Sequence, residues 1–96
     1  MLTNKQKRYL RSEANQLQPL IQIGKNGLTE SVVELIEEAL EAKELVKISI
    51  LQNCGEDKKD IAEKLEKVQD LHVVQIIGST IVLYRESLEK KRIELP

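Results

Sequence analysis

The most informative segment of the chain is Leu20-Ile21-Gln22-Ile23-Gly24-Lys25-Asn26-Gly27-Leu28-Thr29. Its apolar first part follows Pro19 and ends at a glycine, which is typical of a short strand. Its last part is a helix start, because Thr29 can cap the helix and the leucine before it can pack on Val33 as a hydrophobic staple. The segment therefore predicts a strand joined to a helix by a short loop that contains two glycines.

Helical and strand patterns alternate along the rest of the chain. Thr3 and Gln6 have the spacing of a capping box, and Asp57 can cap a later helix. The sequence predicts helices over about 3–17, 29–43 and 57–68, and strands over 20–23, 45–51, 73–77 and 80–85. Gly78-Ser79 between the last two strands is typical of a type II′ hairpin. The order α-β-α-β-α-β-β predicts one two-layer α+β domain, residues 1–96, with a four-stranded mixed sheet.

The predicted second helix has two contrasting faces. One half of its helical wheel is apolar and the other half carries glutamates that we expect to face solvent. The apolar half consists of Val32, Val33, Leu35, Ile36, Ala39 and Leu40, and the acidic half of Glu34, Glu37, Glu38 and Glu41. In the charged C-terminal tail, Ile93 and Leu95 are the side chains expected to dock onto the core.

Composition excludes several classes of protein. A chain of 96 residues with 41% apolar and 32% charged residues suits one globular domain and is neither a disordered chain nor a membrane bundle. The N-terminus lacks the apolar region of a secretory signal, and a single cysteine forms no internal disulfide, so a cytoplasmic protein is expected. Two tyrosines and no Phe or Trp argue against a sheet that stacks bases on aromatic rings.

Charge is distributed unevenly behind a net value of −1. Residues 1–30 carry a net +3, residues 31–70 a net −5 and residues 71–96 a net +1. Nucleic-acid binding depends on a local basic face and not on the total charge. The basic N-terminal third is therefore compatible with an RNA partner.

The loop Gly24-Lys25-Asn26-Gly27 is one candidate binding site. Glycines permit positive φ and leave room for a phosphate near the backbone, and the helix that follows offers free amides at the positive end of its dipole. A GXXG loop clamps a nucleic-acid backbone in KH domains. On spacing alone, a tight turn explains the same residues. No nucleotide P-loop motif is present.

The first predicted helix is the second candidate, because no acid separates its cations before Glu13. These cations are Lys5, Lys7, Arg8 and Arg11, and with Lys25, Arg85, Lys90, Lys91 and Arg92 they could form a stripe that contacts phosphates. The alternative is an ordinary solvated helix face.

Catalytic and metal chemistry have little support. Cys54 and His72 are each the only residue of their type and lie in no motif, so neither a catalytic dyad nor a zinc site is expected. The glutamates of the second helix show no sign of burial, which a catalytic carboxylate requires. We expect no enzymatic activity, no cofactor, no metal, no small-molecule substrate and no membrane segment.

Five separated blocks resemble the YhbY-type proteins with a single CRM (chloroplast RNA splicing and ribosome maturation) domain. The blocks, which span nearly the whole chain, are residues 2–11, 23–30, 44–48, 74–78 and 82–85. The resemblance implies an RNA-binding fold similar to the C-terminal domain of translation initiation factor three, with a GXXG loop at Gly24–Gly27 and a basic first helix. Asn15 and Lys43 stand where the family often has histidine.

The resemblance implies association with RNA of the precursor of the large ribosomal subunit in a bacterial cytoplasm, and a role in ribosome assembly. The expected RNA-binding residues are Gly24, Lys25, Asn26, Gly27, Lys5, Lys7, Arg8, Arg11 and Arg85. With few aromatic residues, recognition of RNA shape is expected to dominate. The alternative function is a protein-interaction adaptor that uses the acidic second helix.

Overall fold

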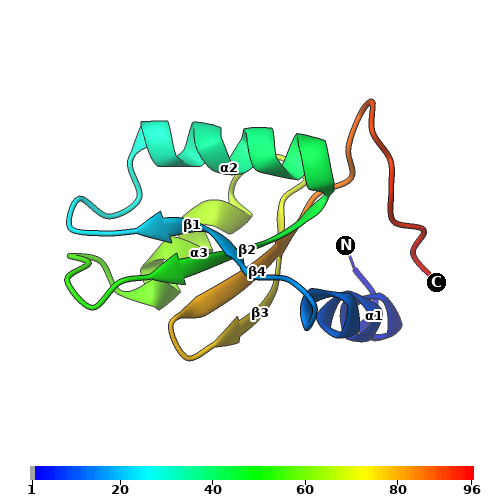
Figure 1. Cartoon of the computed structure of the whole chain (residues 1–96), viewed down its shortest axis with the longest axis horizontal. Helices are drawn as coiled ribbons and strands as arrows, with labels where there is room; N and C mark the ends of the chain where they lie inside the picture. Colours follow the sequence, from blue (N-terminus) through cyan, green and yellow to red (C-terminus); the bar gives the residue numbers. More distant parts are fainter. Residues whose placement is uncertain (1) are drawn as a thin grey trace.

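The computed structural model, which describes residues 2–96, has the predicted order of elements (Figure 1). The elements are α1 (Asn4–Ala14), β1 (Pro19–Ile23), α2 (Glu30–Lys43), β2 (Leu45–Ile50), α3 (Lys58–Glu66), β3 (His72–Ile77) and β4 (Thr80–Tyr84). The strands form one sheet in the order β1-β2-β4-β3. β1 is parallel to β2, and the other two pairs are antiparallel, so the predicted four-stranded mixed sheet is confirmed.

Helices α2 and α3 cover one face of the sheet. Ile36 and Leu40 of α2 and Ile61 and Leu65 of α3 are completely buried in the larger apolar cluster, together with side chains from the strands such as Ile48. These two helices and the sheet form the two expected layers. They place the β1–α2 loop and the β2–α3 loop at the same end of the molecule (Figure 1).

Helix α1 covers part of the opposite face. Leu10 and Ala14 pack in a second apolar cluster with Leu45, Val82 and Tyr84 of the sheet. The cluster also includes partly buried Ile93 and Leu95 of the tail, so the predicted docking of these two residues is confirmed. α1 and the tail therefore enclose one end of this face.

Local signals explain most of the element boundaries. The capping box at Thr3 and Gln6 forms, and Thr29 and Asp57 accept hydrogen bonds from amides of the first turns of α2 and α3. Gly78 has φ 56°, and Ser79 is not among the residues with positive φ, which agrees with the predicted type II′ hairpin.

Two details differ from expectation. Helix α1 ends at Ala14 and not near Leu17, because Asn15 and Gln16 already form a turn before Pro19. Leu35, predicted to be inward, is 53% exposed. It lies at the margin of the apolar arc, where helical periodicity alone does not distinguish a buried position from an exposed one.

The C-terminal tail is held by two glutamates near the end of α2. Glu44 is completely buried, and its carboxylate accepts hydrogen bonds from the amides of Ser87, Arg92 and Ile93 at 2.8, 2.5 and 2.8 Å. Glu41 accepts from the amides of Leu88 and Glu89 at 3.0 and 3.1 Å. The tail thus has a fixed path along the molecule.

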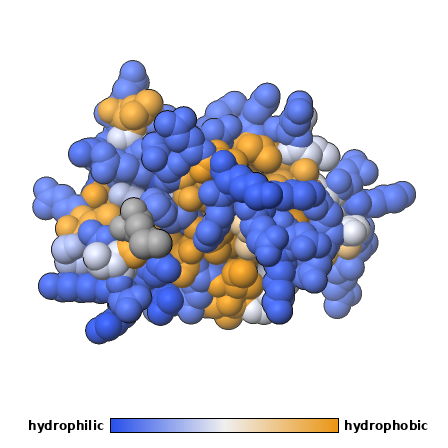
Figure 2. All heavy atoms as spheres, turned by 180° about the vertical axis from the view of Figure 1, so that it is seen from behind, coloured by the Kyte–Doolittle hydropathy of each residue, from blue (hydrophilic) through white to orange (hydrophobic). Residues whose placement is uncertain are grey.

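Seen from behind, the molecule is mostly hydrophilic, with an apolar area near the middle of the view (Figure 2).

Among residues 2–96 no helix is long and apolar enough to cross a bilayer. The same residues contain no group of three or more His, Cys, Asp or Glu side chains arranged to hold a metal ion.

Candidate nucleic-acid interface

The GXXG segment forms a tight loop between β1 and α2. The Gly27 amide donates to the Gly24 carbonyl at 3.0 Å, and Gly27 has φ 69°, in the left-handed region that favours glycine. Lys25 and Asn26 form the exposed tip. No hydrogen bond recorded within residues 2–96 uses the amide of Lys25 or of Asn26. The loop therefore presents two free amides and one cation to solvent.

A glutamate from the β2–α3 loop braces this turn from behind. Glu56 accepts a hydrogen bond from the Leu28 amide at 2.7 Å, and its other oxygen forms an ion pair with Lys64. Both contacts stabilise the carboxylate and hold the pKa of Glu56 below its ordinary value, with Lys64 the stronger cause. A Cβ on Gly27 would lie 2.5 Å from the Glu56 carboxylate, so glycine is required for this brace.

The fold requires glycine at only one of the two glycine positions of the loop. Gly24 does not have positive φ, and a Cβ built on it would meet only Leu51 Cδ1 at 3.7 Å, an ordinary van der Waals contact. The folded chain alone therefore has no need for glycine at position 24. A ligand that approaches the backbone closely would require glycine at this position, because any other side chain would hold the ligand away.

The cations of α1 lie away from the core. The buried face of the helix is Leu10 and Ala14, whereas Lys5, Arg8 and Arg11 are exposed and Lys7 is half-buried. None of the ion pairs found between residues 2 and 96 involves these four side chains or Lys25. Their charge is thus available to an anionic partner.

The charge at the start of α1 opposes the stability of the helix, whereas Arg11 in the last turn favours it. The first turn contains Lys5 and no acid, although the positive end of the helix dipole favours an acid there. Each misplaced cation of this kind costs about 0.3–1 kcal/mol. Folding alone therefore does not explain the basic start of α1.

The loop and α1 lie at opposite ends of the sheet (Figure 1). α1 packs over Leu45 at the start of β2, whereas the loop lies beside Leu51, just beyond its end. On the sheet face that α1 covers only in part, Lys47 and Ser49 of β2 follow Leu45 at alternate positions, and both are partly exposed. This strip, which carries one cation and no acid, connects the two basic regions.

Lys47 was not among the predicted RNA-binding residues. The sequence does indicate that Lys47 is accessible, because polar Lys47 and Ser49 alternate with apolar residues along β2. A lysine in a central strand indicates a sheet face that is not fully covered. Only the partial cover by α1 shows which residues of that face stay open.

Arg85 lies apart from the other predicted site residues. Its guanidinium is 3.0 Å from the Glu37 carboxylate of α2, and its side chain is only 19% exposed. Two cations of the tail also lie next to acids. Lys91 pairs with Glu86 at 3.2 Å, and Lys90 lies beside the glutamates of α2. Arg85 is thus joined to the acidic helix and not to the basic face.

Cys54 and His72 have structural surroundings. Cys54 follows β2 and packs, partly buried, against the larger apolar cluster. His72 begins β3 and stacks on Tyr84, with 6.4 Å between the ring centroids, and burial lowers its pKa. Each side chain thus packs against apolar or aromatic neighbours, Cys54 in the segment between β2 and α3 and His72 at the start of β3.

Comparison with known proteins identifies the class. The model of the CRS1/YhbY (CRM) domain matches residues 2–85, so the chain belongs to the CRS1/YhbY (CRM) domain family.

Similar proteins are named for RNA binding. The probable RNA-binding protein YqeI of Bacillus subtilis is 58% identical over 96 residues, which is 100% of both chains. An RNA-binding protein of Haemophilus influenzae is 40% identical over 99% of this chain and 95% of its own. A solution structure of a hypothetical Staphylococcus aureus protein, described as a candidate for RNA binding, has a TM-score of 0.82 at 53% identity and full coverage of both chains. The names of these relatives describe RNA-binding proteins.

Proposed function

We propose that this protein binds RNA of the large ribosomal subunit precursor in the bacterial cytoplasm and assists its assembly. The observation that carries the proposal is the set of unpaired cations on α1 and on the GXXG loop, joined by the open strip at Lys47. The family membership and the names of the relatives support RNA as the partner.

The mechanism is recognition of the RNA backbone. At the loop, Lys25 and the free amides of Lys25 and Asn26 hold a phosphate, and Gly24 lets that phosphate approach. At the other end of the sheet, Lys7, Arg8 and Arg11 neutralise further phosphates. Two contacts separated by the length of β2 fix the orientation of a structured RNA without reading many of its bases.

The acid that contacts the loop and most acids of α2 do not oppose this mechanism. Glu56, the acid closest to the loop, is neutralised by Lys64. The glutamates of α2 lie on the helix surface that faces away from the sheet, where Glu37 pairs with Arg85. A phosphate on the exposed cations of α1 or on Lys25 meets positive charge, with Glu66 and Asp70 beside Lys7 and Glu30 in the first turn of α2 as the remaining acids.

Salt dependence tests the mechanism directly. Contact with four to six phosphates gives a slope of log K against log salt of about −3 to −5. We expect this slope for fragments of large-subunit rRNA, measured by filter binding. The triple change Lys7→Glu, Arg8→Glu, Arg11→Glu should abolish binding, whereas the control change Lys59→Glu, Lys67→Glu, a double reversal on exposed positions near α3, should not.

Retention of binding by the triple variant, or a flat salt response, would overturn the proposal. Binding to ribosomal protein that survives this charge reversal would instead indicate the adaptor function. The exposed Leu35 among the glutamates of α2 is the feature that such an adaptor would use.

A further inference from the structure

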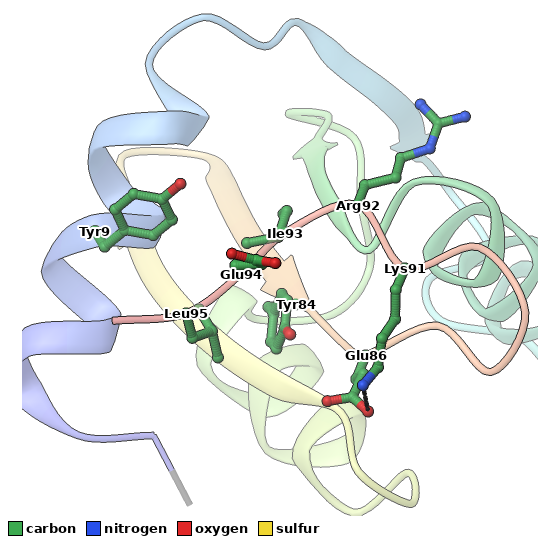
Figure 3. A pocket seen from close by; sticks show the side chains of 8 residues that line it. All are labelled: Tyr9, Tyr84, Glu86, Lys91, Arg92, Ile93, Glu94 and Leu95. Atoms are coloured by element: carbon green, nitrogen blue, oxygen red, sulfur yellow. Dashed lines mark ion pairs between the residues drawn. The ribbon is translucent and has the colours of Figure 1, made fainter.

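A cavity of about 770 Å³ lies between α1, the end of β4 and the C-terminal tail. Its lining includes Tyr9 of α1, Tyr84 of β4 and Arg92 and Glu94 of the tail (Figure 3). None of these belongs to the binding mechanism proposed above. Its outer wall is fixed, because the amides of Arg92 and Ile93 are bonded to the buried Glu44.

The cavity contains an aromatic ring available for stacking. Tyr9 is 36% exposed, whereas Tyr84, the other tyrosine, is only 3% exposed. Tyr9 projects from α1 toward the tail in the view of Figure 3. Every RNA base has a π-face, and an exposed ring of this kind binds one base by stacking.

The cavity also contains polar groups without partners. Among residues 2–96, no hydrogen bond or ion pair uses the hydroxyl of Tyr84 or the carboxylate of Glu94, although Tyr84 is otherwise buried. Burial and the nearby Glu44 and Glu86 raise the pKa of Tyr84, so its hydroxyl stays protonated and can donate. Glu94 is exposed and lines the same cavity as the two tyrosines (Figure 3).

These groups match one base better than the others. The Watson–Crick edge of guanine presents the O6 acceptor beside the N1–H and N2–H donors. A carboxylate accepts from two adjacent donors, and a phenolic hydroxyl donates to the carbonyl oxygen. Adenine presents an acceptor at N1, which a carboxylate repels. Arg92 has no ion pair within residues 2–96, and its guanidinium points away from the two tyrosines in Figure 3, so it is available to a backbone phosphate beside the cavity.

We propose that the cavity between α1 and the tail binds a single unpaired guanine nucleotide of the RNA, stacked on Tyr9 and recognised by Glu94 and Tyr84. This inference rests on the proposed RNA-binding function and adds to it one base-specific contact. It is compatible with the scarcity of aromatic residues, since one ring serves one base.

The test uses two fluorescein-labelled RNA nonamers, U4GU4 and U4AU4, and the full-length protein. We expect fluorescence anisotropy to show U4GU4 bound at least about fivefold more tightly, the discrimination of one good bidentate contact. Tyr9→Leu, which keeps apolar bulk, should weaken binding of U4GU4 about tenfold. Tyr9→Phe, which keeps the ring, should not.

Glu94→Gln should remove the preference for guanine, and the matched change Glu89→Gln, outside the cavity, should keep it. Thermal unfolding of each variant verifies that the fold is intact. Because the chain has two tyrosines and no tryptophan, tyrosine emission reports on this cavity, and its quenching by U4GU4 should be weaker in Tyr9→Phe, where only Tyr84 remains to contact the base.

Equal affinity for the two nonamers, or full affinity of Tyr9→Leu, overturns this inference. If that result accompanies salt-dependent rRNA binding that the triple change on α1 abolishes, the proposed function stands and only the guanine site falls. If the wild type binds neither rRNA fragments nor nonamers, both proposals fall.

Discussion

Alanine at Gly24 distinguishes a loop that binds phosphate from a loop that only turns the chain. In the folded protein an alanine Cβ at this position makes only an ordinary contact, 3.7 Å from Leu51 Cδ1, at a φ that alanine tolerates. Loss of glycine's freedom in the unfolded chain should stabilise the protein by about 0.4–1 kcal/mol. For a domain of this size the melting temperature should rise by about 2–8 °C.

RNA binding by Gly24→Ala should change in the opposite direction. If a phosphate lies against the backbone of the loop, the added Cβ displaces it and removes a charge-assisted hydrogen bond worth about 1.5–3 kcal/mol. Affinity for rRNA fragments should then fall at least about tenfold, as measured by filter binding beside thermal unfolding followed by circular dichroism.

Gly27→Ala is the matched control inside the same loop. Left-handed backbone costs alanine about 1–2 kcal/mol, and its Cβ would displace Glu56 from the Leu28 amide for about 1–3 kcal/mol more. This variant should melt at least about 8 °C lower. A Gly24→Ala protein that is stable and keeps full RNA affinity would refute the reasoning, because the loop would then be only a turn.

Three further predictions follow from the charges. Lys5→Glu with Lys7→Glu should raise the melting temperature, since acids suit the helix start, and should weaken rRNA binding; a lower melting temperature would contradict this. Glu56→Gln should loosen the loop, seen as faster amide exchange at the start of α2, and unchanged exchange would show that the brace is dispensable. Burial raises the pKa of Glu44, but the tail amides outweigh burial and hold it below its ordinary value of 4.5. The stability from Glu44 is therefore complete above pH 4.5 and lost as pH falls through the lower pKa of the folded state. Glu44→Gln should be less stable at neutral pH and lose less on acidification, measured by melting temperature against pH; identical profiles would contradict the role of this carboxylate.

The elements were predictable because their signals are local. Thr3, Thr29 and Asp57 cap helices from a few residues away, and Gly78 turns its hairpin, so the sequence predicted every helix and strand. The exposed α1 cations were also accessible to sequence reasoning, since no nearby acid interrupts them.

Contacts between distant segments were not predictable in this way. The hydrogen bonds of Glu44 join residues 43–49 positions apart, and the ion pair of Arg85 spans 48 positions. Nothing near Arg85 in the sequence indicates that Glu37 holds it. The cavity beside Tyr9 has the same origin, because the path of the tail depends on the glutamates of α2.

Sedimentation through a ribosome gradient tests the central claim most directly. Tagged wild-type protein is compared with the variant Lys25→Glu, Lys7→Glu, Arg8→Glu, and the crosslinked RNA is sequenced. We expect the wild type to migrate with a precursor of the large subunit, crosslinked to its rRNA, while the variant stays at the top. If both stay at the top, or both migrate with the particle, the basic surface is not an rRNA site and the account is contradicted.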